Sequence, residues 1–120
     1  KYRMKKFIFP LIKAVFNWRR YSLMIALKAR KNHDMIGSAS VDYLMYFGYL
    51  VYGYMWVKMA AVASEKLKAG EGCKEFNQGK VQTAKFYFAR MLPRVKAHAV
   101  AIQAGANTLM DIDPDAIIVA

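Results

Sequence analysis

The side chains that most often carry out catalysis are few in this sequence, and none has a partner at a useful spacing. A nucleophile needs an adjacent general base, and a structural metal site needs about four converging ligands. The single cysteine allows neither a disulfide nor a cysteine zinc site within one chain. We therefore predict no catalytic, cofactor-binding or metal-binding residue here. The residues considered are His33, Cys73, His98, Glu65, Glu71 and Glu75.

Each of these residues has a simpler structural interpretation. His33 lies in an expected loop, whereas His98 borders an apolar stripe and is interpreted as a packing or hydrogen-bonding residue. The three glutamates fall near an expected turn at residues 70–72, where a carboxylate stays ionised and aids solubility. A lone cysteine favours a reducing compartment, so we expect a cytoplasmic protein, with a position at the membrane periphery as an open alternative.

Positive charge is large and unevenly distributed. The formal net charge is +11, with ten cations and no acid in residues 1–32, and five cations and no acid in residues 76–110. Such a charge is compatible with a nucleic acid, an anionic membrane or an acidic protein surface as partner, or with a solvated basic face. A row of cations, Lys80, Lys85, Arg90, Arg94 and Lys96, could contact phosphates but lacks a glycine-rich loop or an aromatic platform.

The chain is organised around residues 41–63, a long segment rich in aromatic and aliphatic side chains. No proline occurs from Asp34 to Gly70, which predicts one central, buried helix over residues 34–69. Asp34 is expected to act as its N-cap, and Gly70 is expected to end it in a left-handed conformation. A membrane span is disfavoured, because the uncharged part of this segment covers only residues 43–57 and a span needs about 20 apolar residues. Tyrosines also recur at intervals of three along the whole run, whereas membrane helices collect them at the two interfaces: Tyr43, Tyr46, Tyr49 and Tyr52.

The first helix is expected over residues 11–31, after a break or kink at Pro10. Apolar residues recur there at steps of three and four, beside a cationic face that could lie on anionic lipid or remain in water. The expected packing stripe comprises Leu11, Ala14, Val15, Trp18, Tyr21, Ile25 and Lys28.

The third helix is expected over residues 75–104, kinked or broken at Pro93, with Gly105 as its stop. Its packing stripe comprises Val81, Ala84, Phe88, Met91, Val95, Ala99 and Ile102. After it, residues 111–120 form an acidic and then apolar tail, in which Asp113 could start a last short turn and the final aliphatic residues need a surface on which to dock.

These elements predict an all-α fold, a bundle of three to four long helices. We divide the chain into a basic amphipathic lead and first helix (1–32), a helical domain (33–110) and the tail (111–120). Because the sequence begins at lysine, we expect a fragment or a processed product.

Two stretches resemble the additional C-terminal helical domain of the larger acyl-CoA dehydrogenases. They are IGSASVDYLMYFGYLVYGYMWVKMAAVA (residues 36–63) and KVQTAKFYFARMLPRVKAHAVAIQAGANTLM (residues 80–110). The resemblance lies in the alanine- and serine-rich helix start, the Gly-Tyr-Met-Trp stretch and the later FYFAR-LP segment, and it covers roughly the last two thirds of the chain.

The resemblance implies an FAD-dependent enzyme that removes a proton and a hydride from the α and β carbons of an acyl-CoA. In that family the flavin, the acyl-CoA and the catalytic glutamate belong to preceding domains, and no position here matches them. The appended domain packs over the catalytic body and favours homodimers. We therefore predict a packing and oligomerisation domain that is not catalytic in isolation; the alternative is a basic peripheral-membrane or nucleic-acid-binding helical module.

Overall fold

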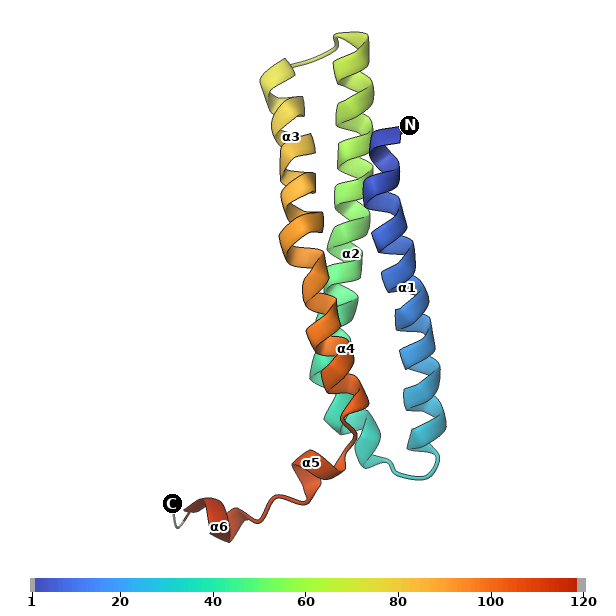
Figure 1. Ribbon diagram of the computed structural model, residues 1–120, viewed down its shortest axis with the longest axis vertical. Helices are drawn as coiled ribbons and strands as arrows, with labels where there is room; N and C mark the ends of the chain where they lie inside the picture. Colours follow the sequence, from blue (N-terminus) through green and yellow to red (C-terminus); the bar gives the residue numbers. More distant parts are fainter. Residues whose placement is uncertain (1, 119–120) are drawn as a thin grey trace.

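Three long helical segments lie side by side in the computed structural model, which describes the backbone of residues 2–118 and the side chains of residues 4–118. They are α1 (Tyr2–Ala29), α2 (Asp34–Ala69) and a third segment that begins with α3 (Lys74–Phe86) and ends with α4 (Val95–Gln103) (Figure 1). Two short helices follow, α5 (Asn107–Met110) and α6 (Pro114–Ile118). All regular elements in the described residues are helical, which confirms the predicted all-α bundle.

Helix α2 is central and contacts both α1 and the third segment. Its bounds agree with the prediction, and Gly70 ends it with a φ of 69° while donating its backbone N–H to the carbonyl of Lys66. The expected N-cap is wrong. Asp34 is already the first helical residue, and the side-chain oxygen of Asn32 instead accepts from the Asp34 N–H at 3.1 Å.

Helix α1 runs without interruption through Pro10, so the predicted start at Leu11 is wrong. Pro10 has no N–H to donate to the backbone carbonyl of Lys6, four residues earlier. Lys6 is exposed, so water can bind this carbonyl instead. The turn before Pro10 also has tertiary contacts. Phe7 is buried against Ala60 and Ala84, and its ring stacks on Phe88 with centroids 5.1 Å apart. This packing stabilises helix that local propensity alone would not predict.

The third segment changes its helical geometry around Pro93, as expected. A π-helical turn (Tyr87–Met91) and a 3-10 turn (Leu92–Arg94) join α3 to α4. The Leu92 N–H donates to the carbonyl of Tyr87, five residues earlier, and this extra residue shifts the buried positions. Tyr87 and Leu92 therefore enter the core although the predicted stripe omitted them, and Phe88 and Met91 are only half-buried.

The main core lies where α1, α2 and α4 meet. Tyr46 and Ile102 are its most deeply buried large side chains, each 1% exposed. The Tyr46 hydroxyl donates to the backbone carbonyl of Ala14 at 2.9 Å and ties α2 to α1. The molecule with its tail measures 65 × 34 × 17 Å, and its shortest dimension corresponds to only about two helix diameters. Consequently α2 buries one face, while much of its opposite face is exposed.

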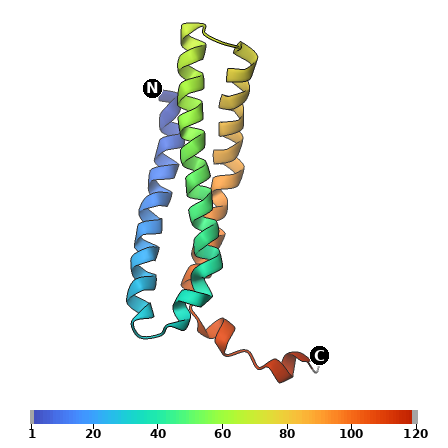
Figure 2. The same cartoon turned by 180° about the vertical axis from the view of Figure 1, so that it is seen from behind.

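The C-terminal tail leaves the end of the bundle and extends away from it (Figures 1 and 2). As predicted, a short helix begins after Asp113, whose carboxylate accepts from the Asp115 N–H at 3.0 Å. Ile117 and Ile118 are 62% and 80% exposed, so they have no docking surface within the described residues. The remaining tail residues, Val119 and Ala120, lie outside the described part of the chain.

Packing around α2 predicts opposite effects at two of its glycines. A Cβ at Gly53 would lie 3.0 Å from Leu11 and within 3.7 Å of Tyr87 and Leu92, whereas a Cβ at Gly48 meets nothing within 4 Å. Gly53→Leu should therefore lower the free energy of unfolding by about 1–3 kcal/mol. Gly48→Ala should raise it by roughly 0.5–1 kcal/mol. Urea denaturation followed by circular dichroism measures both, and equal effects would contradict the close approach at Gly53.

Candidate functional site

His33 and His98 lie outside the α2–α3 turn, which carries the cysteine and two of the three glutamates. His33, Cys73 and the three glutamates are all exposed, and Glu71 and Glu75 lie at the turn between α2 and α3 as expected. The Cys73 thiol donates to the Glu75 carboxylate at 3.5 Å. No group of three histidine, cysteine, aspartate or glutamate side chains in the described residues could hold a metal ion.

His98 has the hydrogen-bonding role expected from the sequence. Its Nδ1 lies 2.9 Å from a carboxylate oxygen of Asp42, and its ring packs on Tyr49 with centroids 5.8 Å apart. Both partners of the pair are partly exposed. This interaction connects α4 to α2, and so His98 contributes to helix packing.

Three tyrosine hydroxyls, those of Tyr43, Tyr46 and Tyr87, form hydrogen bonds to neighbouring helices. Tyr43 shares a 2.7 Å hydrogen bond with the Ser22 hydroxyl, and Tyr87 donates to the Tyr49 carbonyl at 2.6 Å. Burial raises the pKa of Tyr46 and that of Tyr87 to about 12, and neighbouring tyrosines add to both shifts. These hydroxyls are consequently neutral structural donors at ordinary pH.

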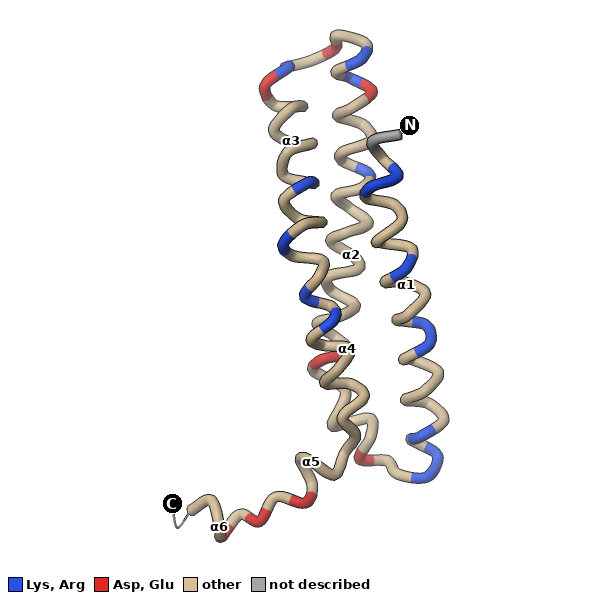
Figure 3. Tube along the Cα trace, in the orientation of Figure 1, with Lys and Arg blue, Asp and Glu red and all other residues tan. Residues whose placement is uncertain are grey.

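Charge is segregated along the molecule (Figure 3). Cations follow α1 and the third segment, whereas most acids lie at the α2–α3 turn and in the tail. Lys80, the first of the predicted row, lies over the rings of Trp56 and Phe76, at 5.6 and 5.2 Å from their centroids. The other four cations of that row are exposed.

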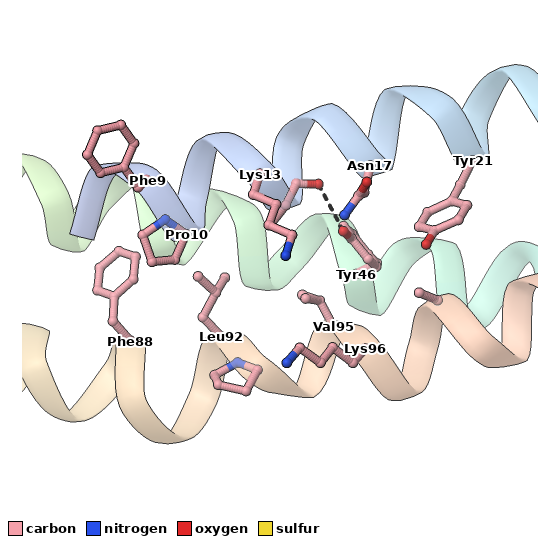
Figure 4. A pocket seen from close by; sticks show the side chains of 13 residues that line it. Phe9, Pro10, Lys13, Asn17, Tyr21, Tyr46, Phe88, Leu92, Val95 and Lys96 are labelled. Atoms are coloured by element: carbon pink, nitrogen blue, oxygen red, sulfur yellow. Dashed lines mark hydrogen bonds between the residues drawn. The ribbon is translucent and has the colours of Figure 1, made fainter. Parts of the chain in front are cut away.

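A groove of about 430 Å³ separates α1 from the third segment, with Tyr46 of α2 at its floor (Figure 4). Apolar groups form most of its walls, among them Phe9, Pro10, Phe88 and Leu92. Lys13 and Lys96 line the gap from opposite sides, and in this view both ammonium groups end over the same stretch of the groove. We call this feature the lysine groove.

A second apolar surface uses the other flanks of α1 and α2. Two hollows of about 380 and 240 Å³ lie along it, and none of their lining residues carries a charge. These hollows share Phe47 and have no lining residue in common with the lysine groove. We call this surface the α1–α2 face, and its exposed members are Val15, Ile36, Leu44, Phe47, Val51 and Tyr54.

A third feature is an exposed apolar stripe on α1 that sequence analysis missed. It faces away from the packing stripe, and its members are Phe9, Ile12, Phe16, Leu23 and Leu27. Lys13, Arg19 and Arg20 lie beside it on the same helix and are also exposed. The spacings of three, four and seven residues between its members could have revealed this stripe. Because α1 is apolar on two sides, the periodicity of its sequence indicated the packing stripe and not the exposed one.

The sequence matches a known protein family over most of its length. Residues 1–113 match the family described as acetyl-CoA dehydrogenase C-terminal like, and the chain therefore belongs to it. The match includes the basic first helix, which the resemblance noted above did not cover. The division of the chain at residues 32 and 110 stays a prediction.

A more particular similarity is to the broad-specificity linear acyl-CoA dehydrogenase FadE5 of Mycobacterium tuberculosis. The two sequences are 35% identical over 80 residues, which is 65% of this chain and 13% of that enzyme. The chain thus spans only a small part of the length of the relative it matches. As for the membrane-span alternative, no helix in the described part of the chain is both long and apolar enough to cross a bilayer.

The buried tyrosines predict a loss of stability at alkaline pH. An unfolded tyrosine has a pKa of about 10, so between about pH 10 and 12 the unfolded state releases protons that the folded state retains. The free energy of unfolding should therefore be unaffected by these groups below pH 10 and fall as the pH rises through this interval. The double variant Tyr46→Phe, Tyr87→Phe should flatten this fall.

Urea midpoints at about pH 9 and about pH 11 measure the effect, since only the higher value lies inside the interval. The control variant is Tyr52→Phe, because Tyr52 is 64% exposed. An alkaline loss that is the same in the double variant as in the parent chain would rule out burial of the two hydroxyls as its source.

Proposed function

We propose that this chain is the C-terminal packing domain of an FAD-dependent acyl-CoA dehydrogenase and is not catalytic by itself. Family membership and similarity to an acyl-CoA dehydrogenase support the proposal. FAD and acyl-CoA would be bound by domains outside this chain. The whole enzyme would act in the cytoplasm as a homodimer. The reading frame upstream of Lys1 should then encode flavin-binding domains, and an upstream frame without them would contradict the proposal.

The α1–α2 face is the observation that carries this proposal. Phe47 and Val51 of α2 lie beside Val15 of α1 and are 42%, 38% and 37% exposed. Monomeric proteins rarely leave a long contiguous apolar surface in water, and such surfaces commonly mark interfaces. Because the residues that line its hollows are uncharged, this face is suited to an apolar partner surface such as a catalytic body.

The internal use of polar groups also favours packing over catalysis. Tyr46 and Tyr87 donate to backbone carbonyls, and His98 binds Asp42. Each of these groups already has a partner from another helix. A catalytic hydroxyl or imidazole would instead need to reach a substrate atom within hydrogen-bond distance.

The exposed α1 stripe supports a second candidate function, binding to the surface of an anionic membrane. Phe16 is 67% exposed and Leu23 is 61% exposed, and the cations Arg19 and Arg20 lie between them in the sequence. A helix with apolar residues flanked by cations can lie in the interface of an anionic bilayer. Nucleic-acid binding, by comparison, is supported by net charge alone.

Packing through the α1–α2 face predicts that the isolated chain self-associates when this face has no catalytic body to cover it. The double variant Phe47→Glu, Val51→Glu should weaken self-association by at least about tenfold, because it places two charges in a surface that must lose water. Sedimentation velocity over a concentration series measures the change. Val100→Glu is the control, since Val100 is exposed on α4 and lines neither hollow of this face. A parent chain that sediments as a clean monomer would contradict the prediction.

Membrane binding through α1 predicts that the chain floats with vesicles containing anionic phospholipid. Phe16→Asp should reduce the bound fraction by about tenfold, because it removes apolar area and adds repulsion from the anionic surface. Phe76→Asp on α3 is the control, since Phe76 is similarly exposed and lies on another helix. Equal losses in the two variants, or no flotation of the parent chain, would eliminate this candidate.

A further inference from the structure

The lysine groove contains two like charges without an acid between them. Lys13 and Lys96 line the gap from opposite walls, and none of the described residues that line the groove is acidic (Figure 4). Within the described residues, no carboxylate lies at ion-pair distance from Lys13 or Lys96. Two ammonium groups on opposite walls of one groove favour an anion in the space between the walls.

The remainder of the groove is suited to apolar side chains. Phe9 and Pro10 of α1 oppose Phe88 and Leu92 of the third segment, directly beside the two lysines. Phe9 is 64% exposed, so the wall it forms is open to an incoming segment. A matching occupant must therefore combine carboxylates with aliphatic groups over a short length of chain.

The C-terminal tail has this composition and has no partner in the structure. Asp111, Asp113 and Asp115 are three of the eight acidic residues of the chain, and all three are exposed. Ile117 and Ile118 follow them within three residues and are also exposed. Every described residue from 107 to 118 is exposed, so the tail is fully available for binding.

We propose that the tail of a second copy of this chain occupies the lysine groove. Aspartates of the tail would lie near Lys13 and Lys96, and its isoleucines would cover the apolar walls. This inference extends the proposed homodimer, because it names the segment and the groove that meet. In a two-fold symmetric pair each copy would supply one tail and one groove.

The path of the chain favours a tail from the second copy over the chain's own tail. The turn after α4 contains Gly105, with a φ of 83°, and from there the tail leaves the bundle end and extends away from it (Figures 1 and 2). Ala99 is the lining residue of the groove that comes last in the sequence, so the groove lies on the bundle side of this turn. The chain's own tail would have to reverse its direction to reach the groove.

Disulfide trapping between two differently tagged copies tests the proposal. Both copies carry Cys73→Ser, which removes the single native cysteine. One copy carries Ala116→Cys in the tail, and the other carries Asn17→Cys in the groove or Thr83→Cys at an exposed position of α3 outside it. A mixed disulfide can then form only between copies. We expect it to form at least about tenfold faster at position 17 than at position 83.

Charge reversal supplies the second arm of the experiment. Lys13→Glu with Lys96→Glu in the groove copy should reduce the rate at position 17 to the rate at position 83. Adding Asp113→Lys and Asp115→Lys to the tail copy should restore it, because the pair of charges is then exchanged. The matched control, Lys85→Glu with Arg90→Glu, changes the net charge equally outside the groove and should leave the rate unchanged.

Equal rates of disulfide formation at positions 17 and 83 would overturn the proposal. A rate at position 17 that is unchanged by Lys13→Glu with Lys96→Glu would also overturn it. Sedimentation of the same samples separates its failure from that of the proposed homodimer. Self-association without selective trapping overturns only the docking of the tail, whereas a monomeric chain overturns both.

Discussion

Within the described residues, helix α2 has neighbours on one side only, and this constraint determines the other properties of the molecule. A 36-residue helix is about 54 Å long, and α1 and the third segment cover it only along the side where they lie. Tyr46, at the centre of that side, is nearly inaccessible and is hydrogen-bonded to α1, whereas Leu44, two residues before it, is 67% exposed. A thin layer of three helices therefore produces a well-packed core and an apolar outer surface from the same segment.

The parts of the fold that follow from local sequence rules could be predicted. The ends of α2 are such a part, because the proline-free run and Gly70 specify them. The parts that failed depend on tertiary contacts. Helix α1 continues through Pro10 because Phe7 packs against α2 and α3, and Tyr87 is buried because a π-turn inserts one residue. Neither contact can be read from the periodicity of a single segment.

The candidate sites were less accessible to sequence reasoning than the fold. The lysine groove brings together Lys13 of α1 and Lys96 of α4, which are about 80 positions apart in the sequence, and each was assigned only to a cationic helix face. The sequence favoured a solvated face for the row of cations that contains Lys96, but it did not indicate that the first member, Lys80, lies over two aromatic rings. The pairing of the helices decides whether a lysine lines a groove or lies over an aromatic ring. The pattern of residues along one helix does not contain this pairing.

The α1–α2 face and the lysine groove differ in charge, and this difference is a physical reason for them to bind different partners. The α1–α2 face has no charge in its hollows, so burial there needs only apolar area. The lysine groove mixes apolar walls with two cations, and an apolar partner alone would leave those cations desolvated and unpaired, at a cost in free energy. The groove thereby discriminates against a purely apolar surface and in favour of a segment that carries carboxylates. Because the two surfaces lie on different flanks of α1, a catalytic body and an acidic tail could be bound by one domain at the same time.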